Sequence, residues 1–159
     1  MIQRRRIYEK ALPSKDAQKI YVFCEGDDRE KNYFDFFRGM SSNLEIIAIP
    51  PYNHKSSPNN LIERAEHLFE GETREYTLDY SQKDTVWFVV DTDEWEECGL
   101  IQCLRSYCKG KNDGKDYPAW NVAQSNPSFE IWLYYHVYEN KPNDKEVSSF
   151  ATFKEYVNS

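Results

Sequence analysis

The chain has 159 residues, of which 40% are hydrophobic and 16% aromatic, and its formal net charge is −7. That length suits one domain, and the large apolar side chains suffice for a core, so a wholly disordered chain is excluded. No stretch approaches the roughly 18 apolar residues of a membrane span, and the basic start of the chain lacks the apolar segment of a secretory signal. We therefore expect a cytoplasmic protein that does not contact a membrane.

The acidic balance is unfavourable for a protein that binds nucleic acid over its whole surface, because phosphate contacts need lysine and arginine. The basic residues are nevertheless concentrated in residues 1–19 and in a later loop with Lys109, Lys111 and Lys115. A metal-dependent phosphodiesterase also needs acidic residues at its centre, where a bound cation reverses the local field. The net charge thus leaves a nucleic-acid partner open.

The four cysteines favour neither disulfides nor a zinc site. Cys98, Cys103 and Cys108 recur every five residues. That spacing turns through about 140° per step on a helix, so the three side chains converge on no common point. Ordinary reduced thiols are the interpretation that fits this spacing.

Short apolar runs alternate with segments of helical periodicity after a polar, basic arm over residues 1–18. This alternation predicts a three-layer α/β/α domain over residues 19–140, with a mainly parallel sheet of about four strands. The expected strands cover 19–24, 44–49, 85–90 and 119–123, and the expected helices cover 29–40, 61–69, 100–107 and 129–138. Residues 141–159 are predicted to be a C-terminal helical extension. Its helix, expected over 147–157, stops so close to the last residue that the pattern favours a truncated chain.

Acidic residues directly follow two of the expected strands, at the edge where parallel sheets bind ligands. Glu25 follows the first strand, and Gly26 lets the backbone turn away from it. Asp91 and Asp93 follow the most apolar strand, and alternation along an extended segment puts both carboxylates on the same side. Mg²⁺ prefers such hard oxygen ligands, so Glu25, Asp91 and Asp93 are predicted to hold Mg²⁺, with Mn²⁺ as the alternative ion. The competing interpretation is that these carboxylates cap helices or are solvated.

A strand-end glutamate followed by a later Asp-x-Asp resembles the Toprim domain, and three sequence blocks are similar to RloB-like proteins in particular. Residues 24–34, Cys-Glu-Gly-Asp-Asp-Arg-Glu-Lys-Asn-Tyr-Phe, resemble the family's opening Cys-Glu-Gly-x-x-Thr-Glu-x-x-Tyr-Phe. Residues 90–94 resemble its Asp-x-Asp segment, and residues 125–133 its Ser-Asn-Pro-x-Phe-Glu-x-Trp-Leu block. The likeness spans residues 19–138, with one departure, because Arg29 stands where the family usually has threonine.

The resemblance implies a Toprim-related, metal-dependent nuclease associated with prokaryotic anti-phage defence. It implies that Asp91 and Asp93 are metal ligands and that Glu25 is an acid/base or metal-contacting carboxylate. The leading hypothesis is therefore Mg²⁺-dependent hydrolysis of RNA or DNA, with a further protein partner in a defence system. Arg29 suits phosphate binding and leaves any role of the family threonine in question.

Two more glutamates are candidates for the catalytic role. Glu30 lies one turn into the first helix, where it would serve a second ion or a water, or would stabilise the helix amino end. Glu130 stands among apolar residues, so it is expected to face the metal site or to pair with a basic residue. Ser125 is interpreted as the cap of a helix that begins near Pro127, and His136 as a hydrogen-bonded core or boundary residue.

Two alternatives to a nuclease are weighed. One is a non-catalytic, Toprim-like module that binds a metal or a protein partner within a defence complex. The other is a nucleotide phosphatase or transferase, which is disfavoured because the chain has neither G-x-G-x-x-G nor a P-loop. The sequence does not choose between RNA and DNA or between one and two ions, and it leaves the oligomeric state unknown.

Overall fold

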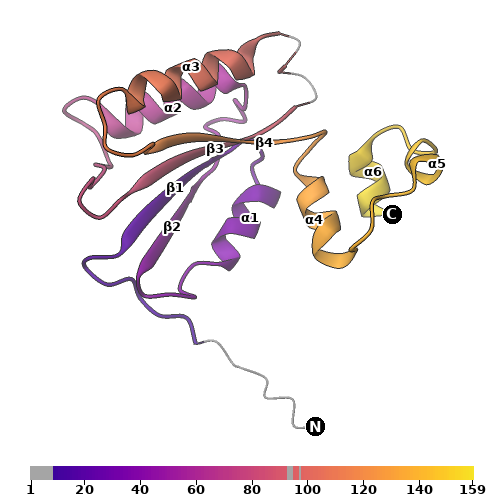
Figure 1. Cartoon of the computed structure of the whole chain (residues 1–159), viewed down its shortest axis with the longest axis horizontal. Helices are drawn as coiled ribbons and strands as arrows, with labels where there is room; N and C mark the ends of the chain where they lie inside the picture. The colour runs from indigo at the N-terminus through magenta and orange to yellow at the C-terminus, as the bar shows by residue number, and fades with distance from the viewer. Residues whose placement is uncertain (1–8, 93–94, 97) are drawn as a thin grey trace.

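The protein is described here by a computed structural model that covers residues 9–92, 95–96 and 98–159. Its centre is a four-stranded sheet in the order β2-β1-β3-β4, and each neighbouring pair of strands is parallel (Figure 1). The strands are β1 (Gln18–Cys24), β2 (Leu44–Ile49), β3 (Thr85–Asp91) and β4 (Trp120–Ser125). The chain runs outward from β1 to β2 and then returns to β3 on the other side of β1. The strand order therefore reverses between β1 and β3, where parallel sheets bind their ligands.

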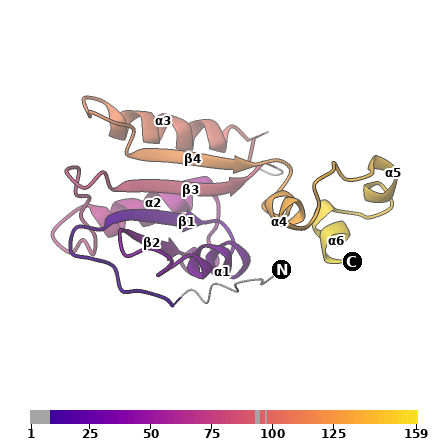
Figure 2. The same cartoon turned by 60° about the horizontal axis from the view of Figure 1, so that its bottom comes forward.

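Helices lie on both faces of the sheet, as Figures 1 and 2 show, so the predicted three-layer fold is confirmed. Helices α2 and α3 cover one face and α1 covers part of the other, while α4, α5 and α6 lie beyond the carboxyl ends of the strands. The helices are α1 (Arg29–Phe36), α2 (Pro58–Phe69), α3 (Leu100–Asn112), α4 (Glu130–Val137), α5 (Asp144–Val147) and α6 (Phe153–Asn158).

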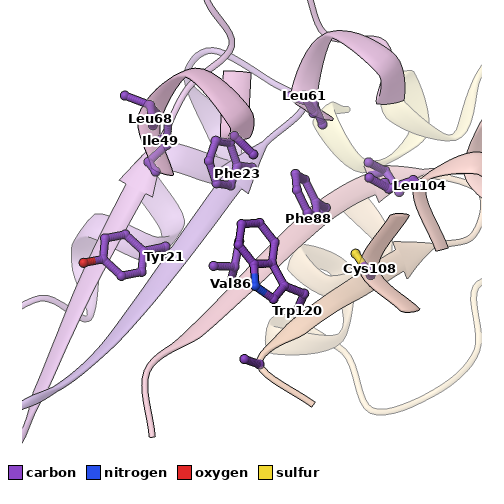
Figure 3. Close-up of a cluster of buried hydrophobic side chains, with 13 residues drawn as sticks. Tyr21, Phe23, Ile49, Leu61, Leu68, Val86, Phe88, Leu104, Cys108 and Trp120 are labelled. Carbon is purple, nitrogen blue, oxygen red and sulfur yellow. The ribbon is translucent and has the colours of Figure 1, made fainter. Parts of the chain in front are cut away.

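The main core fills the space between the sheet and helices α2 and α3 (Figure 3). Alternation along the strands points Phe23, Phe88 and Trp120 to this face. The rings of Phe23 and Phe88 stack with centroids 5.1 Å apart, and those of Phe88 and Trp120 with centroids 6.3 Å apart. Leu61 of α2 and Leu104 of α3 are fully buried against this row of rings. The aromatic row thus joins three strands to both helices.

The opposite face has a smaller core, built from Val22, Cys24, Val89 and Phe129 with aromatic side chains of α1 packed on it. Alternation along β3 points Trp87 to this face, where 36% of its surface is exposed. Most of the apolar burial therefore lies on the side of α2 and α3.

Helix α1 ends at Phe36 and does not continue to residue 40 as the sequence predicts. Gly39 has a φ of 80°, a left-handed value at which an α-helix cannot continue and which L side chains rarely adopt. The carbonyl of Gly39 accepts a hydrogen bond of 2.8 Å from the N–H of Ala11, so the basic arm packs where the helix turns away. A Cβ at Gly39 would lie 3.0 Å from the carbonyl oxygen of Ala11.

The prediction of a single helix over 147–157 is wrong, because the chain forms the two short helices α5 and α6 there. The Ser148 and Ser149 hydroxyls donate to carbonyls of α5, at 2.9 and 2.6 Å, and so end that helix. Thr152 then caps α6 by accepting from the N–H of Glu155 at 3.2 Å. Helix α3, by contrast, continues to Asn112 despite Gly110, five residues beyond the expected end.

None of the helices in the described part of the chain has both the length and the apolar character that a membrane span requires.

The main core makes a prediction about stability. Leu61 is fully buried, so Leu61→Ala removes apolar contacts and leaves a cavity, and the free energy of unfolding should fall by about 2–5 kcal/mol. Leu12 is 89% exposed and provides a control, since Leu12→Ala should change stability by less than about 0.5 kcal/mol. Urea unfolding followed by circular dichroism measures both. Equal losses for the two variants would contradict this assignment of the core.

Candidate functional site

Two neighbouring strand ends bring Glu25 and Asp91 together. Strands β1 and β3 are paired so that Cys24 lies opposite Val89, and the N–H of Glu25 continues the ladder by donating to the carbonyl of Val89 at 3.2 Å. The side chain of Glu25 then crosses the gap, because its Oε2 accepts from the N–H of Asp91 at 2.7 Å. Its Oε1 accepts from Nε1 of Trp95 at 2.8 Å. Glu25 thus bridges the two strands at the point where their order reverses.

Asp91 is 4% exposed and joins β3 to the C-terminal helices. Its Oδ1 accepts from the N–H of Phe129 at 2.7 Å, which fixes the start of α4. Its Oδ2 lies 3.3 Å from Nζ of Lys154 on α6. A buried carboxylate is costly unless it is paired and hydrogen-bonded, and these contacts lower that cost.

Glu30 lies in the first turn of α1 with 8% of its surface exposed. Its carboxylate sits against Gly26, where an added Cβ would be 2.0 Å from Oε2, so any side chain at that position would displace it. Burial raises the pKa of Glu30, and the charges of Asp91 and Glu130 raise it further. The N–H of Glu30 itself and the Lys154 ammonium act in the opposite direction. Glu30 therefore feels negative charge from both β3 and α4.

Glu130 opens α4 and is 2% exposed. Its Oε2 accepts from the Ser128 hydroxyl at 2.7 Å, and its Oε1 pairs with the guanidinium of Arg29. Burial alone would raise the pKa of Glu130, but Ser128, its own N–H, Arg29 and Lys154 together outweigh burial, so the pKa is lowered. The expected pairing with a basic residue is present. Its partner is Arg29, the residue at the family's threonine position.

Glu25, Glu30, Asp91 and Glu130 thus all lie at the carboxyl edge of the sheet, where Glu25 contacts the backbone of Asp91 and the charges of Asp91 and Glu130 act on Glu30. We refer to these four residues as the carboxylate cluster. Asp93, the third predicted metal ligand, lies outside the described residues, so its role stays a prediction. Within residues 9–92, 95–96 and 98–159, no group of three acidic, histidine or cysteine side chains has the geometry of a metal site. The donors still suit Mg²⁺ or Mn²⁺ chemically, because they are carboxylate oxygens, the hard ligands that these ions prefer.

Among the described residues, Lys154 and Trp95 contact the cluster although the sequence indicated neither of them. A lone lysine in a short polar segment is ordinarily solvated, and residues 141–159 were expected to be a separate extension. The only hint is the apolar pair Phe153 and Tyr156, which flank Lys154 and would let one face of a helix pack against the domain. The position of the ammonium follows from how α6 packs on α4, and local sequence does not define that packing.

Ser125 does not cap a helix, so that interpretation is wrong. Strand β4 continues through Ser125, whose hydroxyl oxygen accepts from Nε1 of Trp132 at 2.9 Å. The cap residue of α4 is Phe129, which makes no side-chain capping bond. The peptide bond between Asn126 and Pro127 is cis. Instead of capping α4, the Ser125 backbone ties the strand ends together, because its carbonyl accepts from the N–H of Thr92 at 2.9 Å.

His136 is hydrogen-bonded, as expected, but it is exposed and is not a core or boundary residue. Its Nε2 lies 3.1 Å from the Tyr33 hydroxyl and its Nδ1 lies 2.6 Å from the carbonyl oxygen of Trp132. A proton on Nδ1 satisfies both contacts, since Nδ1 then donates to the carbonyl and Nε2 accepts from the hydroxyl. The Tyr33 contact links α4 to α1, whereas the Trp132 contact lies within α4.

Comparison with known proteins places these observations in a family. A family model described as RloB-like protein matches residues 20–158. The chain belongs to the RloB-like protein family. No curated protein matches it, and no solved structure does. The RloB-like match includes the whole carboxylate cluster and extends to Lys154, so the segment beyond α4 is part of the region that defines the family.

The raised pKa of Glu30 makes stability depend on pH. The folded protein holds the Glu30 proton more tightly than the unfolded chain does, so ionisation of Glu30 destabilises the fold as pH rises above 4.5, the ordinary pKa of a glutamate. We expect Glu30→Gln, measured in chelator without divalent ions, to raise Tm at about pH 7 and to lose that advantage at about pH 4. Thermal unfolding by circular dichroism measures both.

Glu72→Gln, at an exposed position, is the control and should leave Tm unchanged at either pH. A lower Tm for Glu30→Gln at neutral pH would show that the ionised carboxylate stabilises the fold.

Proposed function

We propose that this RloB-like protein is a Mg²⁺-dependent nuclease that hydrolyses phosphodiester bonds of RNA or DNA in prokaryotic anti-phage defence, acting in the cytoplasm. The observation that carries the proposal is the hydrogen bond from the Asp91 N–H to the Glu25 carboxylate at the reversal of strand order, with Glu30 and Glu130 buried at the same edge of the sheet. Four carboxylates in one place disfavour a stable core, whereas they suit a site for cations. The Toprim-like arrangement read from the sequence supports the same chemistry.

The residues of the cluster would serve in the proposed reaction as metal ligands, as a base and as the partner of Arg29. Glu25 and Asp91 would hold the metal, together with the predicted ligand Asp93. A bound Mg²⁺ would neutralise charge on the scissile phosphate and lower the pKa of the attacking water. Glu30 would accept the proton, because a carboxyl with a raised pKa is the better base at neutral pH. Glu130 would hold Arg29 beside the cluster, where the half-exposed guanidinium can contact a phosphate.

The surface next to the cluster supports a nucleic-acid substrate. Helix α4 begins at Glu130 and exposes Trp132 and Tyr135, and the next residue after the helix, Tyr138, is exposed too, at 54%, 47% and 56% of their surface respectively. Exposed aromatic rings stack on unpaired bases without regard to sequence. The sequence suggested that most aromatic residues belong to the core, but these three do not. A single-stranded segment or loop is therefore the favoured form of substrate.

The nuclease proposal is tested by mutation of Asp91. Purified protein is incubated with labelled tRNA and with single- and double-stranded DNA, in Mg²⁺ or Mn²⁺. We expect wild type to cleave at least one substrate and Asp91→Asn to cleave about 100-fold more slowly or not at all, because the substitution removes a charged ligand. Asp116→Asn, at an exposed position before β4, should cleave as wild type does. Identical products from wild type and Asp91→Asn would exclude the catalytic role.

A non-catalytic binding module is the second candidate, and one observation favours it. Both carboxylate oxygens of Glu25 accept hydrogen bonds, from the Asp91 N–H and the Trp95 indole, as expected of a structural bridge. Each oxygen has a second lone pair and can still meet a metal. Calorimetric titration with Mn²⁺ separates the candidates when it is read beside the cleavage assay. Mn²⁺ binding that Asp91→Asn abolishes, together with no cleavage by wild type, would identify a module.

A further inference from the structure

We propose that Lys154 is a built-in counter-ion of the carboxylate cluster, which competes with the divalent cation for Asp91 and so opposes metal binding while α6 is docked. This inference rests on the proposed function, because it takes the cluster as the metal site. It adds a regulatory role for the C-terminal segment, which the proposed reaction does not use.

The position of the ammonium is the first observation. Nζ of Lys154 lies 3.3 Å from Oδ2 of Asp91, the oxygen that the Phe129 N–H does not occupy. The same positive charge opposes the effect of burial on the pKa of Glu30 and of Glu130. The ammonium therefore contacts the carboxylate of β3 and also acts on those of α1 and α4. A divalent cation bound at Asp91 would lie among the same carboxylates.

The two cations exclude each other on electrostatic grounds. An ammonium and a divalent ion that share one carboxylate lie within a few ångströms of each other, where like charges repel strongly in a partly buried site. Mg²⁺ also needs near-octahedral oxygen donors at close range, and the carboxylate oxygen that Lys154 contacts would be one of them. Metal binding must therefore displace the ammonium, and the docked ammonium must weaken metal binding by the same factor.

The attachment of α6 is suited to such an exchange. No residue of α5 or α6 is buried. Among the described residues, Tyr134 of α4 also contacts α6, and its ring lies 6.4 Å from that of Phe153 and 6.0 Å from that of Tyr156. Elements with few buried contacts open at low free-energy cost. The Lys154 ion pair is accordingly a substantial part of what holds α6 in place, and a metal ion can release it.

Calorimetric titration with Mn²⁺ tests the proposal on the full chain. Lys154→Met keeps the length of the side chain and removes its charge, so Mn²⁺ should bind about 2- to 5-fold more tightly than to wild type, the range of a partly exposed ion pair. Lys154→Arg keeps the charge and should not bind Mn²⁺ more tightly. Lys145→Met is the matched control, because it removes an exposed ammonium from the same segment, on α5.

A second readout follows the segment itself. Limited proteolysis with a glutamate-specific protease measures how readily the exposed Glu139, between α4 and α5, is cut. Mn²⁺ should speed this cut in wild type, while Lys154→Met should be cut quickly with or without the ion. Tighter Mn²⁺ binding by Lys154→Met together with metal-stimulated cleavage of wild type supports the proposal.

A failure of this inference can be distinguished from a failure of the proposed function. If Lys154→Met binds Mn²⁺ as wild type does or more weakly, the ammonium does not compete and this inference is overturned, while the metal site of the proposed function stands. If Lys145→Met shows the same gain as Lys154→Met, the effect is one of general charge and the inference is again overturned. If neither wild type nor any variant binds Mn²⁺, the proposed metal site itself fails, and the inference fails with it.

Discussion

The arrangement of the C-terminal half depends on the contacts that the Asp91 carboxylate makes. Asp91 ends the most apolar strand, accepts from the first turn of α4 and faces the ammonium of α6. Its own N–H is held by Glu25 from the neighbouring strand. An unpaired charge at 4% exposure would cost far more than the fold can supply, so these partners are required by the burial of Asp91. The end of the sheet, the start of α4 and the docking of α6 are thereby coupled to one side chain.

The pKa values of the two flanking glutamates are shifted in opposite directions, although burial acts to raise both. Glu130 has a hydroxyl and a guanidinium as partners, and its pKa is lowered despite its depth. Glu30 is packed on Gly26 beside two negative neighbours, and its pKa is raised. Two carboxylates with divergent pKa values in one site are a frequent mark of divided acid and base roles. The difference comes from which donors each helix start presents, because the two residue types are the same.

The strands of the domain, and the positions of Glu25 and Asp91 at the ends of two of them, could be predicted from local sequence patterns. The strands were predicted within two residues because apolar, β-branched runs between turn residues are distinctive. Placing Glu25 and Asp91 at strand ends followed from those boundaries, and the parallel sheet put both at one edge. The ends of α1 and α3 were harder to predict from the sequence. Gly39, just after α1, has a positive φ and contacts the arm, whereas α3 continues through Gly110. The same residue type has opposite consequences according to its tertiary contacts.

The sequence by itself determined the alternation of strands and helices, the membership of the RloB-like family and the acidic residues that follow β1 and β3. Each of these depends on residues that are close together in the sequence, so short contiguous segments are enough to predict it. Only the tertiary structure decided that β1 and β3 are neighbours, that Arg29 pairs with Glu130 and that Lys154 reaches Asp91 from 63 residues further along the chain. Those contacts depend on how separate helices dock at the carboxyl edge of the sheet. Docking is governed by burial and charge summed over the whole domain, which no local pattern records.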